Sequence, residues 1–168
     1  MSEQQPDAEF RADLVVTRIL NAPVEAVWEY WTVPAKFKRW WGPQGFTAPI
    51  IEMDVRVGGK YMWCMKGPEG SDFPVACSTG TFTEVVPRER LRYNVLWANE
   101  QGQIVKAADL NMDFPDEIMD QVTFEGLPDG RTVLTITEYA LPLNQMFAYA
   151  YSGWMESLDK MEAALKEE

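Results

Sequence analysis

The C-terminal part of the chain constrains the fold most, because it carries a long apolar stripe with helical spacing. In LNQMFAYAYSGWMESLDKMEAALKEE, the apolar side chains recur at steps of three and four residues: Leu143, Phe147, Ala150, Trp154, Leu158, Met161 and Leu165. This spacing predicts an amphipathic helix of about 23 residues, roughly 35 Å long. Gly153 weakens the helix by about 1 kcal/mol relative to Ala, and we interpret it as a point where helix and sheet approach closely, in preference to a position that leaves clearance for a ligand.

Such a helix needs a broad apolar surface, and strand-length runs between residues 47 and 141 predict one. The runs are TAPIIEMDV, KYMWCMK, STGTFTEVV, RLRYNVLWA, EIMDQVTFEGL and RTVLTITEYAL, which are rich in β-branched and aromatic residues. Turn sequences separate them without helices, which favours an antiparallel sheet. Leu134 and Ile136 alternate with Thr135 and Thr137, so one face is expected to be buried and the other wetted.

The N-terminal part adds one strand and two short helices. FRADLVVTRIL (10–20) predicts the first strand, and VEAVWEYW (24–31) predicts a helix with Trp28 and Trp31 on its apolar face. Pro34 ends this helix, and AKFKRWW predicts a short second helix that stops at Gly42. We therefore expect an α+β fold of about seven antiparallel strands curved around a long C-terminal helix. A polar tail (1–9) would precede a single domain (10–168).

A 19-residue break without a clear strand or helix pattern runs from Asn99 to Glu117. Loops of this length usually have a function or are partly mobile. Its acidic residues lack the regular ligand spacing and central glycine of a calcium loop. We interpret the segment as a solvated acidic loop and expect no metal site.

The charge balance excludes several classes of partner. With 26 acidic and 15 basic residues, the net charge is −11, which disfavours nucleic acid and acidic membrane surfaces. The polar start MSEQQPDAEF is unlike a signal peptide, and no run approaches the roughly 18 apolar residues of a membrane span. We therefore expect a cytoplasmic protein that does not insert into membranes.

The chain has no histidine, which removes the most common general base and metal ligand. The sequence therefore indicates no cofactor, and no residue is assigned as catalytic. Cys64 and Cys77 flank an expected hairpin turn, and their spacing fits neither a zinc site nor a disulfide framework. We expect both to be reduced, buried thiols.

Six sequence blocks in one order resemble the activator of Hsp 90 ATPase homologue-like family, within the START-like (SRPBCC, birch-pollen-allergen-like) superfamily. The blocks lie between Leu14 and Leu165: NAPVEAVWEYWT, RWWGPQGF, MDVRVGGKY, GTFTEVVPRERLRY, VTFEGLPDGRTVLTIT and SGWMESLDKM. The resemblance implies a helix-grip fold with an internal cavity, which the superfamily uses for lipids, polyketides and other apolar molecules. The co-chaperone that names the family has an additional N-terminal domain, for which this chain has no room.

Aromatic side chains on several expected elements are candidates for lining this cavity. Binding cavities are mainly apolar and aromatic, with a few polar groups that orient the ligand. For any one of these aromatic residues, packing in the core is about twice as probable as contact with a ligand. Their number nevertheless favours a cavity. The candidate ligand-binding residues are Trp28, Trp31, Trp40, Trp41, Phe46, Tyr61, Trp63, Tyr93, Trp97, Met119, Phe147, Tyr151 and Trp154.

Trp40 and Trp41 in KFKRWWGPQGF need separate treatment, because adjacent residues on a helix point about 100° apart. We expect one ring to pack in the core and the other to lie at the cavity mouth or on a partner-facing surface. The sequence does not say which ring does which.

These observations lead to three hypotheses for the function. The leading hypothesis is a protein that binds a small hydrophobic or amphipathic molecule and is not an enzyme. The second is an enzyme that uses the same cavity, such as a polyketide cyclase or hydrolase, with Glu138 as a weakly supported base. The third is a module that regulates a chaperone ATPase or binds another protein. A homodimer is compatible with all three.

Overall fold

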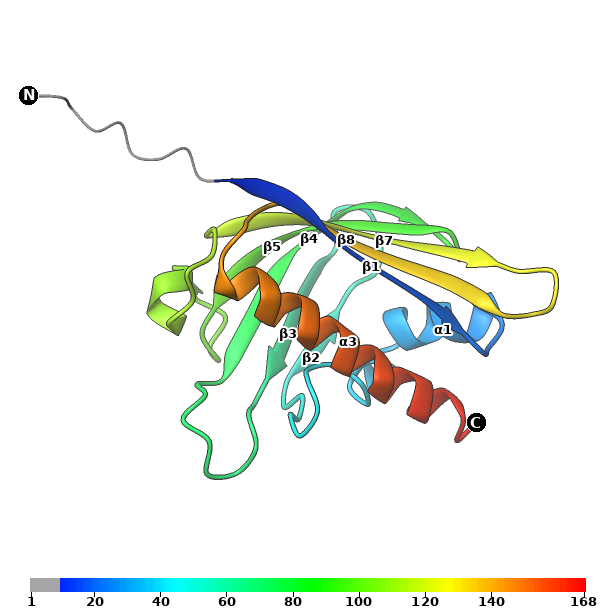
Figure 1. Cartoon of the computed structure of the whole chain (residues 1–168), viewed down its shortest axis with the longest axis horizontal. Helices are drawn as coiled ribbons and strands as arrows, with labels where there is room; N and C mark the ends of the chain where they lie inside the picture. The colour runs from blue at the N-terminus through cyan, green and yellow to red at the C-terminus, as the bar shows by residue number, and fades with distance from the viewer. Residues whose placement is uncertain (1–9) are drawn as a thin grey trace, which may run out of the picture.

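The computed structural model describes residues 10–168, which form one antiparallel sheet with a long helix packed against one face (Figure 1). Seven strands follow the order β1-β8-β7-β5-β4-β3-β2, and a short eighth strand, β6, pairs with β5 outside this path. The α+β helix-grip fold predicted from the sequence is confirmed. The expected tail, residues 1–9, lies outside the described residues.

The elements follow the chain in the predicted order. The first three are strand β1 (Arg11–Leu20) and the helices α1 (Val24–Thr32) and α2 (Pro34–Phe37). The remaining strands are β2 (Ile51–Met53), β3 (Lys60–Met65), β4 (Ala76–Val86), β5 (Arg90–Ala98), β6 (Ile104–Val105), β7 (Glu117–Gly126) and β8 (Thr132–Pro142). A turn of 3-10 helix, η1 (Ala107–Leu110), follows β6, and the chain ends with helix α3 (Gln145–Leu165).

Helix α3 begins where a side chain can replace the missing helical hydrogen bonds. The Asn144 side chain accepts a hydrogen bond from the Phe147 backbone N–H at 3.1 Å, which caps the first turn. Leu143 lies before the cap and is 56% exposed, so it does not belong to the apolar stripe. Trp154, Leu158 and Met161 supply the buried face of the helix.

Gly153 does not mark a close approach of helix and sheet, contrary to the sequence interpretation. A Cβ atom added there would have a single neighbour within 4 Å, the Pro43 side chain at 3.6 Å, which is an ordinary contact distance. The glycine therefore leaves open space beside α3 that a side chain would occupy.

An aromatic cluster joins the two short helices to α3. Trp31 lies 4.8 Å from Trp40 and 6.0 Å from Trp154 between ring centroids, and Phe37 lies 4.7 Å from Trp40. Helix α2 ends at Phe37, so Trp40 and Trp41 lie in the turn that follows it. This packing places the turn beside α3, where it can form one wall of an internal space.

The break between β5 and β7 is more regular than the expected acidic loop. It contains β6 and η1, and two of its acids are used locally. The Asp109 carboxylate accepts a hydrogen bond from the Lys106 backbone N–H at 3.0 Å, and the Asp116 carboxylate accepts one from the Ala107 N–H at 2.9 Å.

No helix among the described residues is long and apolar enough to cross a membrane.

The expectation of two reduced cysteines is wrong. Cys64 on β3 and Cys77 on β4 are directly opposite each other in the antiparallel pairing, and their sulfur atoms form a disulfide. The pairing register, which the sequence spacing does not reveal, brings them together. Disulfides persist mainly in oxidising compartments, so this bond does not fit the cytoplasmic location expected from the sequence.

Because Cys64 and Cys77 form a disulfide, neither should react with an alkylating reagent in the unfolded protein until a reductant is added. Alkylation in denaturant followed by intact mass measurement should give no label without reductant and two labels after reduction. Replacing both cysteines by Ala should lower the free energy of unfolding by about 3 kcal/mol, since the bond restricts the unfolded chain by joining residues 13 positions apart. Two labels on protein that never met a reductant would contradict the bond.

Candidate functional site

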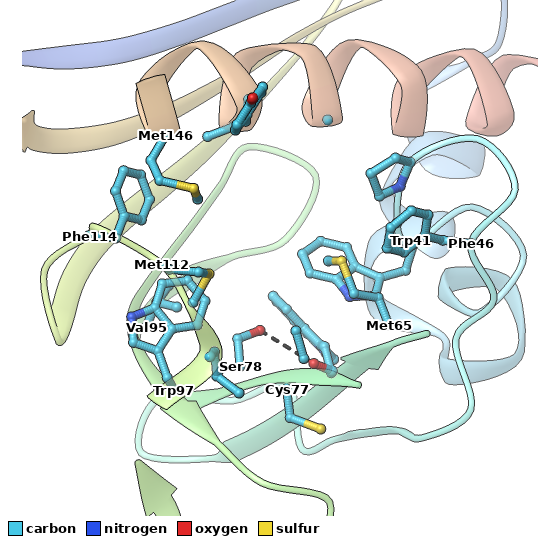
Figure 2. Close-up of a pocket in the computed structure, with 18 of the residues that line it drawn as sticks. Trp41, Phe46, Met65, Cys77, Ser78, Val95, Trp97, Met112, Phe114 and Met146 are labelled. Carbon is cyan, nitrogen blue, oxygen red and sulfur yellow. Dashed lines mark hydrogen bonds between the residues drawn. The ribbon is translucent and has the colours of Figure 1, made fainter. Parts of the chain in front are cut away.

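A cavity of about 570 Å³ lies between α3 and the sheet, within the size range of small-molecule sites. Its walls come from β3, β4, β5, β7, β8, the start of α3 and the loops around residues 41–46, 72–74 and 110–114. Figure 2 shows that Trp41, Phe46 and Met65 lie at one end. At the other end are Val95, Trp97, Met112, Phe114 and Met146. The walls are therefore mainly aromatic rings and thioethers.

The aromatic end near α2 is held by a lysine on α3. The Lys160 ammonium nitrogen lies 3.0–3.4 Å from the backbone carbonyl oxygens of Trp41, Gly42, Pro43 and Phe46, which share its three N–H donors. Partial burial lowers the pKa of this ammonium, whereas the carbonyl oxygens favour its charged form. One cation thus ties the WWGPQGF turn to the helix.

The opposite end is held by Trp97 on β5. Its indole Nε1 donates a hydrogen bond to the Pro115 carbonyl oxygen at 2.8 Å, and its ring lies 6.4 Å from that of Phe114. This contact fixes the segment after η1 against the sheet. The cavity is therefore bounded at both ends by loops that specific side chains hold in place.

A row of paired residues crosses the sheet and carries two acids into this apolar interior. Phe82, Tyr93, Asp120, Glu138 and Leu14 are neighbours in register through β4, β5, β7, β8 and β1. All five are at most 6% exposed. Of these, Tyr93, Asp120 and Glu138 line the cavity.

The two carboxyl groups have different partners. Trp154 Nε1, from α3, donates a hydrogen bond to Glu138 Oε1 at 2.9 Å. Oδ1 of Asp120 and the Tyr93 hydroxyl are buried and make no hydrogen bond of ordinary length and angle, although Asp120 lies close enough to Tyr93 and Glu138 to interact with both. Buried polar groups usually have a partner, so this part of the cavity wall has unused hydrogen-bonding capacity.

Burial raises the pKa of both carboxyl groups above the ordinary values, because the charged forms lose hydration. The negative charge of neighbouring Glu138 raises the pKa of Asp120 further. The Trp154 hydrogen bond lowers the pKa of Glu138 and limits its rise. Glu138 is therefore the first of the pair to ionise, and Asp120 holds its proton to higher pH.

Six of the thirteen residues proposed from the sequence line this cavity. Trp40 is fully buried in the aromatic cluster, whereas Trp41 lines the cavity, which assigns the two rings of the WW pair. The six are Trp41, Phe46, Trp63, Tyr93, Trp97 and Trp154. Their contact with a ligand stays a prediction.

The structure places the other seven outside the cavity. Trp31, Trp40 and Tyr61 are core residues, and the Tyr61 hydroxyl donates to the Asn94 carbonyl oxygen at 2.8 Å. Trp28 packs edge-on against Phe124.

The last three of the seven lie on surfaces or at the edge of the core. Met119 is 40% exposed because it alternates with the buried residues of β7. Tyr151 is 44% exposed on α3, and Phe147 packs at the edge of the core.

Sequence reasoning missed Asp120, and it named Glu138 only as a weakly supported base. The sequence did contain a signal for both. In EIMDQVTF, Asp120 has the same strand parity as Ile118 and Val122, and Glu138 has the parity of Ile136. An acid in the buried phase of an alternating strand indicates a functional or specially paired group.

Comparison with known proteins gives the family. Residues 21–166 match the family described as Activator of Hsp90 ATPase homolog 1-like protein. The chain belongs to this family. Among proteins of curated function, none matches.

Several solved structures of bacterial proteins have the same fold. A protein from Chromobacterium violaceum is 25% identical, with a TM-score of 0.74 over 91% of this chain and 96% of that one. A protein from Arthrobacter aurescens is 25% identical, with a TM-score of 0.73 over 93% and 87%. The AHSA1 protein from Silicibacter pomeroyi is 25% identical, with a TM-score of 0.71 over 92% and 98%. The match thus covers nearly the whole length of these three proteins.

The cavity's polar groups suit hydrogen bonding and proton exchange better than metal binding. Within residues 10–168, no three Cys, Asp or Glu side chains gather closely enough to hold a metal ion. The polar groups on the strands that line the cavity are the Ser78 hydroxyl, the Tyr93 phenol, the two carboxyl groups and the indole N–H groups of Trp63 and Trp97. Burial keeps the pKa of Tyr93 well above its ordinary value, so this phenol stays protonated.

The raised pKa values predict that stability falls as pH rises from about 4, the ordinary carboxyl pKa, through the values in the folded protein. In that window the folded state holds protons that the unfolded state has released, so each rise in pH favours unfolding. Asp120→Asn should flatten this slope. It should also stabilise the protein at neutral pH, by about 1.4 kcal/mol for each pH unit between the ordinary carboxyl pKa and the lower of the folded-state pKa and the working pH.

Urea unfolding measured between pH 4 and 8 checks this expectation. Glu125→Gln is the control, because it makes the same change in formal charge at an exposed position on the same strand. Equal slopes for wild type and Asp120→Asn would contradict the raised pKa.

Proposed function

We propose that this protein binds a small hydrophobic or amphipathic molecule in the cavity between α3 and the sheet. The observation that carries the proposal is the cavity itself, which aromatic and thioether side chains line without filling. Burial of apolar ligand surface would supply the affinity, at about 25 cal/mol per Å². The few polar groups on the strands would orient the ligand.

Membership of the family supports this proposal through the shared fold but does not identify a ligand. The Hsp90 ATPase activation in the family's description belongs to the protein after which it is named. The cytoplasmic location and a homodimer stay predictions of the sequence, and ligand binding requires neither.

A second candidate is an enzyme that uses the same cavity. Buried carboxyl groups with raised pKa values are typical of general acids and bases, and Asp120 and Glu138 face the cavity from adjacent strands. Glu138 would act as the base and Asp120 as the acid. Recovery of every bound test molecule with unchanged mass after prolonged incubation would count against this candidate.

The binding proposal predicts that apolar molecules raise the melting temperature and that filling the cavity removes this effect. Dodecanol and ethylnaphthalene are suitable probes, and native mass spectrometry would give the stoichiometry. Gly153→Leu should weaken binding by about tenfold or more, because its side chain enters the open space beside α3. Its helix propensity should keep the protein folded.

Ala163→Leu is the matched control, since it adds the same kind of side chain to an exposed position of the same helix. This variant should bind like wild type. The proposal fails if no apolar molecule binds, or if Gly153→Leu binds as well as wild type.

A further inference from the structure

The cavity wall has a single sign of charge. Three carboxyl-bearing residues line it, Asp72, Asp120 and Glu138, and within the described residues no Lys or Arg does. The chain as a whole also carries a net charge of −11. An anionic head group would therefore enter against a repulsive field with no cation to pair it, whereas a cationic group would be attracted.

Two buried polar atoms without a hydrogen-bond partner lie where the acids are, and the indole Nε1 atoms of Trp41 and Trp63 are unpartnered elsewhere in the cavity wall. Tyr93 is 1% exposed and Asp120 is 3% exposed, and Oη of Tyr93 and Oδ1 of Asp120 lack hydrogen-bond partners. The two residues are direct neighbours in the β5–β7 register, and Asp120 is next to Glu138 in the β7–β8 register. A ligand that donates several hydrogen bonds at this point would satisfy groups whose isolation costs stability.

Aromatic rings line the same cavity. The rings of Trp63 and Tyr93 lie 5.2 Å apart between centroids, and those of Trp41 and Trp154 lie 5.5 Å apart. All four residues line the cavity. Aromatic faces attract cations, and an ammonium group that has lost its water benefits most from them.

We infer that the cavity takes an apolar molecule with a protonated amine, whose ammonium group lies against Asp120 and Glu138. This inference rests on the proposed binding function and adds the charge of the ligand to it. Glu138, which Trp154 orients through a 2.9 Å hydrogen bond, provides the negative charge. The Asp120 carboxyl oxygen and the Tyr93 hydroxyl oxygen accept the other N–H bonds, and the apolar body lies among Val95, Met112 and the other cavity walls.

Three probes with one alkyl chain test the sign of the charge: dodecylamine, dodecanol and dodecanoate, each below its micelle-forming concentration. Calorimetry at neutral pH should show dodecylamine binding about tenfold or more tightly than dodecanol, because charge-assisted hydrogen bonds are stronger than neutral ones. Dodecanoate should bind most weakly. Naphthylethylamine and ethylnaphthalene repeat the comparison with an aromatic body.

Asp120→Asn and Glu138→Gln test the residues. Each keeps a hydrogen-bonding side chain of similar shape, and the amide oxygen introduced by Glu138→Gln can still accept from Trp154. Glu138→Gln should reduce the affinity for dodecylamine about tenfold and the affinity for dodecanol much less, and Asp120→Asn should reduce the amine preference less than Glu138→Gln does. Glu125→Gln is the control for the change in net charge and should keep the full preference.

The outcomes separate this inference from the proposed function. If dodecanol binds as tightly as the amine, or dodecanoate binds most tightly, the inference is overturned and the binding function stands. The same holds if Glu138→Gln keeps the amine preference. If none of the probes with either body binds, both the inference and the binding function are overturned.

Discussion

The hydrogen bond from Trp154 Nε1 to Glu138 Oε1 links the two layers of this fold at the point where the cavity forms. Trp154 also stacks on Trp31, so the same ring fixes α3 against helix α1. Because an aromatic ring and a buried carboxyl group hold helix and sheet together here, small residues of α3 can leave the space beside them open. The cavity depends on this spacing.

Keeping two acids under a helix opposes stability, because ionising either one in the buried site costs hydration, and the charge on Glu138 opposes ionisation of Asp120. Apolar side chains in the Asp120 and Glu138 positions would continue the pattern of Phe82 and Leu14 in the same row. Natural proteins often accept such a loss of stability at functional sites. The position of the pair, at an apolar cavity and not at the surface, favours a role in ligand recognition.

Much of the fold could be predicted, because it follows from local patterns. Period-two runs and turn residues marked the strands, and the spacing of three and four residues marked α3. The less regular segments were harder. The expected second helix ended early at Phe37, and the break after β5 contained β6 and η1, since tertiary contacts decide whether short segments become regular.

The site could be predicted only in part, because cavity lining is a property of three-dimensional packing. Aromatic content pointed to Trp63, Tyr93 and Trp97 but equally to core residues such as Trp31 and Tyr61. Nothing local separates a ring that fills a core from one that borders a space. Strand parity would have identified Asp120, since it lies in the same phase as Ile118 and Val122.

The sequence by itself determined the strands, the long helix and the family, because alternation, helical spacing and motif order are encoded along the chain. It also determined the excess of negative charge. Only the tertiary structure decided that Cys64 meets Cys77, that Trp41 and not Trp40 borders the cavity, and that Asp120 lies beside Glu138. The physical reason is register: pairing between strands distant in sequence decides which side chains meet, and no local propensity specifies it.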